Sequence, residues 1–447
     1  MVLLYIFAED TIKLPKMNSS RKVLRTVLTV NFIFLTLSIF GQTAEIDRSH
    51  LKIQEQTDQV FDSLVSLRRD FHRHPELAEQ EKRTSKKIAA YLKALGLEVH
   101  TNIGGYGVVG ILKTNKKGKH IAWRADIDAL ASNHPDKVNF SSEKAGVRHI
   151  CGHDVHTTIA LGMANVLSSI KEDLTGTVYF IFQPAEENLK GAKAMIADGL
   201  FDLINPDEIY ALHIAPMPEG VISTKANNLY ADYKSIQIAF TKTREKEQLI
   251  EYTKELLLNL QNVKSDSKFW DNRNLIDAKI GLGNPNTIFK DYITVNPNIQ
   301  IEENDDKIFI RAYLSAEKHT EVDSILSRIE LNIKESDFSK EFKGITIGNE
   351  AAIVLNDENL TYSSMSTLNT MYGNKQVQPL YGAIPDGRSD DFSFFQNKIP
   401  GVYFLLGASN FEKGIISMPH SSNFAVDENS IKVGVKSFSS LILERLK

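Results

Sequence analysis

Residues 176–200 read GTVYFIFQPAEENLKGAKAMIADGL, which is the pattern of a strand, a loop and a helix in succession. The first part is a continuous apolar run rich in β-branched and aromatic residues, typical of a strand that is buried on both faces of a sheet. Similar runs occur at residues 119–126 (KHIAWRAD), 208–215 (EIYALHIA) and 401–407 (GVYFLLG), and predicted helices lie between them. This alternation predicts an α/β protein with a sheet that is covered by helices on both faces.

The middle of the chain has a different pattern, which predicts a second and smaller domain. From residue 226 onward an alternating strand (KSIQIAFTK) is followed by an amphipathic helix (EQLIEYTKELLLNLQNV), two further strands and another helix. This α+β pattern extends over roughly a hundred residues, which is enough for a small domain. We therefore expect a larger domain in two parts, residues 51–225 and 341–447, with a smaller α+β domain inserted at residues 226–340.

Residues 17–44 have the pattern of a secretory signal peptide. The basic stretch NSSRKVLR precedes the uncharged apolar run TVLTVNFIFLTLSIF, and small or polar residues follow as far as Ala44. Because this run is short for a membrane span, we expect an exported protein, periplasmic or secreted, with no stable membrane span after removal of the signal. A single-helix membrane anchor is the alternative, and Met17 is a second candidate for the start of the chain.

The charge and cysteine content restricts both the partners and the chemistry. The chain has 52 Lys and Arg against 56 Asp and Glu, and no block of like charge that would indicate a nucleic acid or an anionic membrane surface as a partner. Cys151 is the only cysteine. In an oxidising compartment a lone thiol is at risk of oxidation unless it is buried or bonded to a metal.

Side chains suited to metal binding or acid–base chemistry lie next to the ends of predicted strands: Cys151, His153, Glu186, Glu187, His213 and His420. Loops at the carboxyl ends of strands meet in one crevice of an open α/β sheet. Thiolate, imidazole and carboxylate together suit a cation such as Zn²⁺. One tetrahedral zinc would not need all of these ligands, but two metals about 3.5–4 Å apart with a shared ligand would use them. A bridging thiolate would explain the lone cysteine.

The adjacent carboxylates Glu186 and Glu187 indicate a division of roles. In an extended loop neighbouring side chains point in different directions, so one can bind metal while the other takes a proton from water and passes it to a leaving nitrogen. Taken singly, each candidate is more commonly a structural residue. A nucleophilic Cys151 with His153 or His156 as its base is the alternative. The two-residue spacing is short for such a pair, whereas it suits metal chelation.

Taken in order, these motifs resemble the M20 family of metallopeptidases, and specifically its branch of hippurate hydrolases, N-acyl-amino-acid amidohydrolases and auxin-conjugate hydrolases. The resemblance covers about residues 55–447 and rests on the segments LRRDFHRHPELAEQEKRTSKKIAAYLKALG, WRADIDAL, HICGHDVH, FQPAEENLKGAKAMIADGLF, ALHIAP, SDDFSFF, IPGVYFLLG and HSSNF. Several ordered motifs are far more specific than any one alone. The resemblance implies a zinc-peptidase-like catalytic domain, with a mixed sheet between helices, and a ferredoxin-like lid domain that commonly forms a dimer interface.

The resemblance also implies a role for each matching residue. The residues that match the metal ligands, with the cysteine as the bridging ligand, are Cys151, His153, Glu187, His213 and His420. Glu186 matches the general base, and Asp128 matches an aspartate that orients a metal-bound imidazole. Arg311 and Asn298 lie where the family has residues for binding the substrate. The implied cofactors are two divalent metal ions, zinc or manganese, although the same ligands also accept cobalt or nickel.

The inserted domain departs from the family pattern. Family lids carry a G-G-H segment whose histidine is thought to stabilise the developing oxyanion, whereas this chain has FTKTREKEQ there and no histidine between His213 and His319. An oxyanion donor is typically worth about 10²–10³ in rate. Either another donor such as Arg311 or Asn298 replaces it, or the second metal is sufficient, or turnover is slow.

We therefore expect an exported hydrolase with two metal ions that cleaves the amide bond of an N-acyl amino acid or a small peptide, with a homodimer formed through the lid domain. A dipeptidase or carboxypeptidase of the same family is one alternative. The other is a protein that binds metal or ligand without turnover. The missing lid histidine favours this second alternative, and the complete set of candidate ligands disfavours it.

Overall fold

The computed structural model describes residues 48–447, apart from residues 137, 351–352 and 386–388. The expected signal peptide at residues 17–44 lies outside the described residues. Residues 52–447 form one compact unit. Within the described part of the chain, no helix has both the length and the apolar character that a membrane crossing requires.

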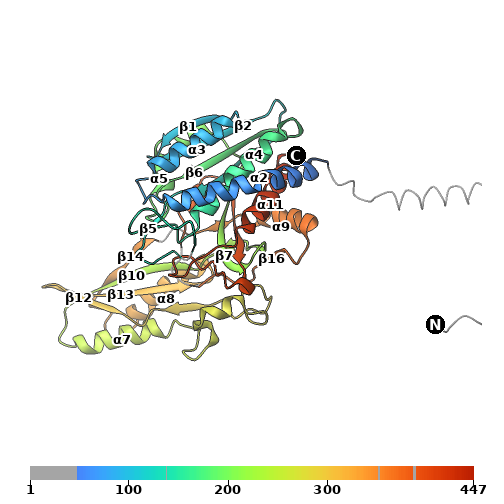
Figure 1. Ribbon diagram of the computed structural model, residues 1–447. Coiled ribbons are helices and arrows are strands. Elements are labelled where there is room, and N and C mark those ends of the chain that lie inside the picture. The colour runs from blue at the N-terminus through green and yellow to red at the C-terminus, as the bar shows by residue number, and fades with distance from the viewer. Residues whose placement is uncertain (1–47, 137, 351–352, 386–388) are drawn as a thin grey trace, which may run out of the picture. The chain divides into compact units, whose positions relative to one another are not determined.

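An eight-stranded mixed sheet, here called the main sheet, organises most of this unit (Figure 1). Its strands lie in the order β1 (Glu98–Ile103), β2 (Gly107–Lys113), β6 (Thr177–Gln183), β3 (His120–Asp126), β7 (Glu208–Pro218), β17 (Gly401–Ser409), β8 (Ile222–Thr224) and β16 (Val377–Pro379). The central strands β6, β3, β7 and β17 pair in parallel, whereas β2 is antiparallel to both of its neighbours. The structure confirms the predicted α/β class with a mixed sheet between helices.

Helices cover both faces of the main sheet because its central strands alternate their side chains between two hydrophobic clusters. In β6, Phe180 and Phe182 belong to one cluster and Ile181 belongs to the other. The first cluster includes side chains of helices α2 (Arg48–Arg73), α3 (Lys82–Ala94), α4 (His153–Ser169), α9 (Glu358–Tyr372) and α11 (Asn429–Leu446). The second includes side chains of α5 (Gly191–Ala197), α6 (Leu200–Leu203) and α10 (Phe392–Gln396). The continuous apolar runs in the sequence are therefore strands that are buried on both faces.

A second sheet is formed by the inserted part of the chain (Figure 1). Its order is β11 (Ile293–Val295), β13 (Lys307–Ala316), β10 (Asp232–Thr241) and β14 (Phe342–Glu350), and β12 (Gln300–Glu303) also pairs with β13. Helices α7 (Lys246–Leu258) and α8 (His319–Lys334) contribute Leu249 and Ile325 to a separate hydrophobic cluster with this sheet. Because β14 pairs with β10, the expected boundary at residue 340 is too early. That the insert is an independent domain stays a prediction.

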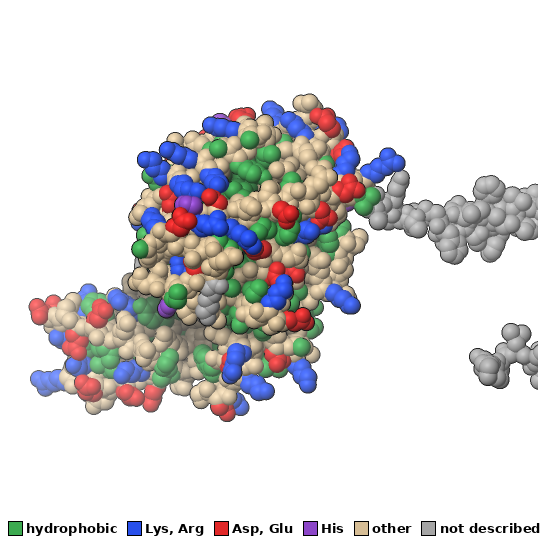
Figure 2. Space-filling model, viewed as in Figure 1, with side chains coloured by type: hydrophobic (Ala, Val, Ile, Leu, Met, Phe, Trp, Pro, Cys, Tyr) green, Lys and Arg blue, Asp and Glu red, His purple; other side chains and the backbone are tan. Residues whose placement is uncertain are grey.

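Short ladders connect these parts. Strand β9 (Asn227–Asn228) pairs with β15 (Leu355–Asn356) where the chain enters and leaves the second sheet, and β4 (Leu130–Ala131) pairs with β5 (Val147–Arg148) near the carboxyl end of β3. On the face shown in Figure 2, Lys and Arg side chains are interspersed with Asp and Glu side chains. This distribution fits the nearly balanced charge composition.

The segment between α7 and β11 leaves the second sheet and packs against the main sheet. It contains two short 3-10 helices, Lys268–Trp270 and Asn272–Ile276. Phe269, Phe289 and Tyr292 from this segment belong to the hydrophobic cluster on the α5 and α10 side of the main sheet. No pattern in the sequence predicted this contact.

Candidate metal centre

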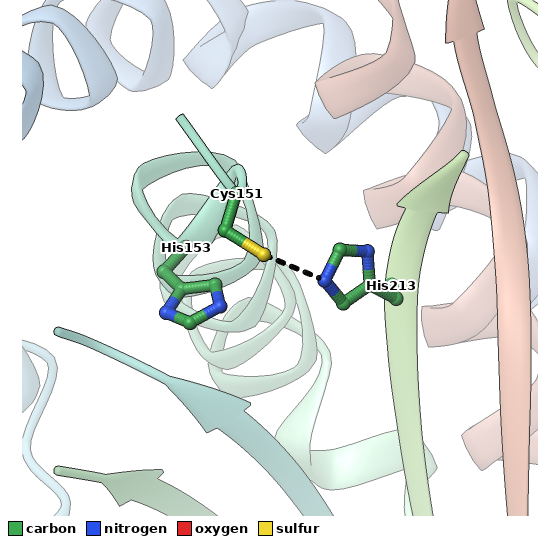
Figure 3. A group of neighbouring side chains, drawn as sticks. All are labelled: Cys151, His153 and His213. Atoms are coloured by element: carbon green, nitrogen blue, oxygen red, sulfur yellow. Dashed lines mark hydrogen bonds between the residues drawn. The ribbon is translucent and has the colours of Figure 1, made fainter. Parts of the chain in front are cut away.

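The cysteine and the second histidine of the HICGHDVH motif flank a sharp turn at the start of α4 (Figure 3). Between them, Gly152 has a φ angle of +102°, a conformation that favours glycine. A Cβ atom at this position would lie 2.3 Å from the side chain of Ile214, so the turn has no room for a larger residue. The turn brings the ligand atoms of Cys151 and His153 to within 4.8 Å of each other and of a ring nitrogen of His213 on β7.

Hydrogen bonds orient the two buried imidazoles. His213 Nδ1 donates to the carbonyl oxygen of Ile214 at 2.7 Å, and its Nε2 lies 3.2 Å from Cys151 Sγ. His153 Nδ1 lies 2.9 Å from the carbonyl oxygen of Asp128 and 3.1 Å from its Oδ1. Because Nδ1 is the donor in both rings, the neutral form of each ring carries its lone pair on Nε2, and this is the form that binds a metal.

His420 and Glu187 close the other side of the centre. His420 Nε2 lies 3.1 Å from Cys151 Sγ and 3.4 Å from Glu187 Oε2. The second carboxylate oxygen, Glu187 Oε1, lies 3.7 Å from His153 Nε2. Asp128 accepts the backbone N–H of Glu187 through Oδ2 at 3.0 Å. One aspartate therefore orients both an imidazole and the loop that carries a candidate ligand.

These donor atoms fit a pair of divalent cations. Cys151, His153 and His213 form one close group, and Cys151, Glu187 and His420 form a second, so the sulfur is common to both. His153 Nε2 and Glu187 Oε1 are buried without a hydrogen-bond partner in the described structure. Buried polar atoms are costly unless a ligand satisfies them. Thiolate, imidazole and carboxylate together suit zinc, and related divalent ions are also compatible.

Glu81 holds the loop that carries the two glutamates. In this loop Ala185 has a φ angle of +52°, which is unusual for a residue other than glycine. Glu81 is buried, and its Oε1 accepts the N–H of Ala185 at 2.8 Å. This bond fixes the backbone directly before Glu186. Glu81 belongs to the HPELAEQE segment of the first family motif, but its role was not predicted from the sequence.

Burial shifts the pKa values of several groups in the direction that favours the neutral form of each group. Burial, followed by the nearby charge of Asp390, raises the pKa of Glu186 well above its usual value. Burial and the charge of Glu187 likewise raise the pKa of the Cys151 thiol. Burial lowers the pKa of His213 well below its usual value. Bound dications would reverse this preference for the thiol, because only the thiolate is a good ligand, and their charge would likewise favour the ionised carboxylate of Glu186.

A buried ion network lies beside Glu186 and links the WRADIDAL and SDDFSFF motifs. Arg124 Nη1 lies 2.6 Å from Asp126 Oδ2, and its Nη2 lies 3.1 Å from Oδ1 of both Asp390 and Asp391. Carboxylate oxygens of Glu186, Asp390 and Asp391 lie within 4.8 Å of one another. Buried charges persist when they are paired in this way. Both motifs are evident in the sequence, but no sequence pattern predicted a role for the four residues of this network.

The two expected substrate-binding residues do not join this centre. Arg311 on β13 donates from Nη2 to Gln237 at 2.9 Å, and its Nη1 lies 3.3 Å from Glu302. Asn298 is exposed in the loop between β11 and β12. Neither residue lines the cavity that contains the candidate ligands. The structure therefore does not bring either side chain to the metal centre, and their role in binding the substrate stays a prediction.

The centre opens into a cavity of about 920 Å³. Its wall includes the candidate base and four of the five candidate ligands: Cys151, Glu186, Glu187, His213 and His420. Most other lining residues are apolar, and several come from the segment between α7 and β11. Among the described lining residues, the histidines are these same two candidate ligands. The lid histidine of the family pattern thus has no counterpart in the described wall.

Known proteins resemble this chain along most of its length. The family model described as Peptidase family M20/M25/M40 matches residues 122–444. Thermostable carboxypeptidase 2 of Saccharolobus solfataricus is 31% identical over 408 residues, which cover 88% of this chain and 98% of that protein. IAA-amino acid hydrolase ILR1-like 2 of Arabidopsis thaliana is 27% identical over 94% of this chain and 95% of its own length.

A solved structure has the same fold. The Bacillus subtilis YXEP protein, described as a dinuclear metal binding peptidase from the M20 family, superposes with a TM-score of 0.68. The two proteins are 24% identical, and the match covers 87% of this chain and 99% of that one. The match therefore extends over both the main sheet and the inserted part of the chain.

Proposed function

The chain belongs to the peptidase family M20/M25/M40, whose members hydrolyse amide or peptide bonds, and on this premise we propose that it is a metal-dependent amidohydrolase of N-acyl amino acids or small peptides. The observation that supports the proposal most directly is the meeting of five candidate ligands from distant parts of the chain. Cys151 is common to two groups of donor atoms, and two buried donor atoms in these groups have no hydrogen-bond partner in the described structure.

The residues of the site have different roles in hydrolysis. Two divalent cations would be held by Cys151, His153, Glu187, His213 and His420. When bound, such cations polarise an amide carbonyl and lower the pKa of water. Glu186 lines the cavity beside this group, and its carboxylate accepts a proton from the attacking water and then gives it to the leaving nitrogen. Asp128 orients the candidate ligands through its bonds to His153 and to the backbone of Glu187.

The substitution Glu186→Gln tests this proposal. Glutamine has nearly the same shape but cannot accept and release the proton, so hydrolysis of N-acetyl and N-benzoyl amino acids should fall by at least about 10²–10⁴-fold. The metal content of the variant, measured by elemental mass spectrometry, should equal that of wild type. Glu172→Gln changes an exposed carboxylate and serves as the control. Retained activity in Glu186→Gln would rule out this residue as the base.

A carboxypeptidase is the second candidate, because the first relative is named as one. A panel of N-acyl amino acids, dipeptides and longer peptides distinguishes the two activities through kcat/KM. Preference for the acylated amino acids supports the amidohydrolase, and preference for peptides supports the carboxypeptidase. If the fully metal-loaded protein hydrolysed none of these compounds, a binding protein without turnover would replace both candidates.

We also propose that the protein is exported and that residues 17–44 are removed as a signal peptide. The basic stretch and the apolar run in the sequence support this proposal. Expression of the full chain followed by fractionation and N-terminal sequencing provides the test. An exported product that begins after residue 44 is expected, and an uncleaved chain that stays in the cytoplasm would contradict export.

A further inference from the structure

One wall of the cavity comes from the inserted part of the chain, and this wall is largely apolar. Leu275, Ile276, Ala278 and Leu282 line the cavity from the segment between α7 and β11. Lining residues from the rest of the chain are also mainly apolar and include Met217, Val221, Leu380, Ile384 and Leu405. The side chain of Ile276 is 54% exposed although it is large and apolar. Exposed apolar surface in a concave site is a common feature of ligand-binding grooves.

Hydrogen bonds within the segment hold the wall in a defined conformation. The N–H of Leu282 donates to the carbonyl oxygen of Leu275 at 2.9 Å, and the N–H of Gly281 donates to that of Asp277 at 2.8 Å. The Asp277 carboxylate accepts the N–H groups of the two residues that follow Ala278. Residues 275–283 therefore form a closed turn that is held by hydrogen bonds within the segment.

The wall is also attached to the loop that follows β16. The N–H of Tyr381 donates to the carbonyl oxygen of Leu282 at 2.8 Å. A Cβ atom at Gly382 would lie 2.1 Å from the carbonyl oxygen of Phe289, so the two backbones touch at this point. These contacts fix the wall relative to Leu380, which lines the cavity from the same loop.

The size and composition of the cavity indicate what it selects. Sites for drug-sized ligands have volumes of about 300–1,000 Å³, and this cavity, at about 920 Å³, is near the upper limit. An N-acetyl amino acid is much smaller than such a ligand. Burial of apolar surface is favourable in proportion to its area, so a larger apolar substrate gains more from this wall.

We propose that residues 275–283 form an apolar subsite that selects amide substrates with a bulky apolar group on one side of the scissile bond, with Ile276 as a specificity-determining residue. This inference rests on the proposed function, because the subsite adjoins the same metal centre.

Two substrate series test the proposal with the metal-loaded, full-length protein. In the first, the acyl group of an N-acylglycine grows from acetyl to octanoyl. In the second, the amino acid of an N-acetyl amino acid changes from glycine to leucine and phenylalanine. In wild type, kcat/KM should rise roughly tenfold or more from the smallest to the largest member of at least one series. The Ile276→Ser variant should lower this ratio at least about fivefold.

Leu331→Ser is the matched control, because Leu331 on α8 is 56% exposed and does not line the cavity. It should keep the wild-type ratio. Flat kcat/KM values in both series, or an unchanged ratio in Ile276→Ser, would overturn the subsite while leaving the proposed function intact.

If no compound is hydrolysed, the proposed function fails, and calorimetric binding of N-octanoylglycine and N-acetylglycine tests the subsite by itself. Tighter binding of the octanoyl compound that is lost in Ile276→Ser would support the subsite. Equal binding of the two compounds would overturn it.

Discussion

Replacing Glu81 with glutamine probes the group that holds the loop before Glu186. Glu81 is fully buried, and its Oε1 accepts the N–H groups of Ala185 at 2.8 Å and of Glu79 at 3.0 Å. Its Oε2 is buried without a hydrogen-bond partner in the described structure. Burial raises the pKa of Glu81 from 4.5 to about 7, although the backbone N–H groups oppose this shift. The folded protein therefore disfavours the charged form of this carboxyl.

The dependence of stability on pH follows from proton binding in the two states. Above pH 4.5 the unfolded chain releases the proton of Glu81, whereas the folded protein keeps it until about pH 7. The free energy of unfolding therefore falls as the pH rises through this window and levels off above it. Since one pH unit is worth about 1.4 kcal/mol for one proton, the fall due to Glu81 is about 3 kcal/mol.

Urea unfolding of metal-free protein at several pH values measures this contribution. Glutamine does not titrate. The free energy of unfolding of Glu81→Gln, relative to that of wild type, should therefore rise by about 3 kcal/mol between pH 4.5 and pH 7. Glu79→Gln changes an exposed carboxyl of the same turn and should follow the wild-type profile. A profile of Glu81→Gln that ran parallel to that of wild type across this window would show that Glu81 does not keep its proton in the folded protein.

Three further substitutions test the centre and its supports. Cys151→Ser removes the donor that is common to two groups, so metal analysis should show loss of at least one cation per chain, and full occupancy would exclude a bridging role. Asp128→Ala removes the partner of an imidazole ligand, so competition with a chelator should show metal affinity lowered about 10–100-fold, and unchanged affinity would count against this orientation. Gly152→Ala places a Cβ atom 2.3 Å from the side chain of Ile214, so the melting temperature of metal-free protein should fall, with a cost of about 1–3 kcal/mol. Gly105 has a similar φ angle but open space around it, so Gly105→Ala is the control. An equal loss of stability in both variants would show that the contact with Ile214 is not destabilising.

The features that the sequence predicted correctly are those with a local cause. Strands β3, β6, β7 and β17 are continuous apolar runs, and the structure buries them on both faces of the main sheet. Their carboxyl ends lie near one another because the strands are parallel. This geometry, together with the ordered motifs, predicted that Glu187 from the end of β6 would approach His213 from β7. The structure places both residues in the wall of one cavity.

The features that the sequence did not predict depend on contacts between distant segments. Glu81 bonds to Ala185 across a large separation along the chain, and nothing in its local pattern distinguishes it from a surface carboxylate. The apolar wall around Ile276 lies in a segment without regular periodicity, and its position is set by contacts with the loop after β16. The contacts of Arg311 with Gln237 and Glu302 on the second sheet likewise join separate segments, and no local pattern predicted them.

In the proposed centre, one sulfur, three imidazoles and one carboxylate bind a pair of cations. Anomalous diffraction from a crystal grown with excess zinc would locate these cations. We predict two anomalous peaks about 3.5–4 Å apart, with Cys151 Sγ between them and the other ligand side chains around them. A centre without zinc, or zinc bound only by other residues, would exclude this dinuclear centre.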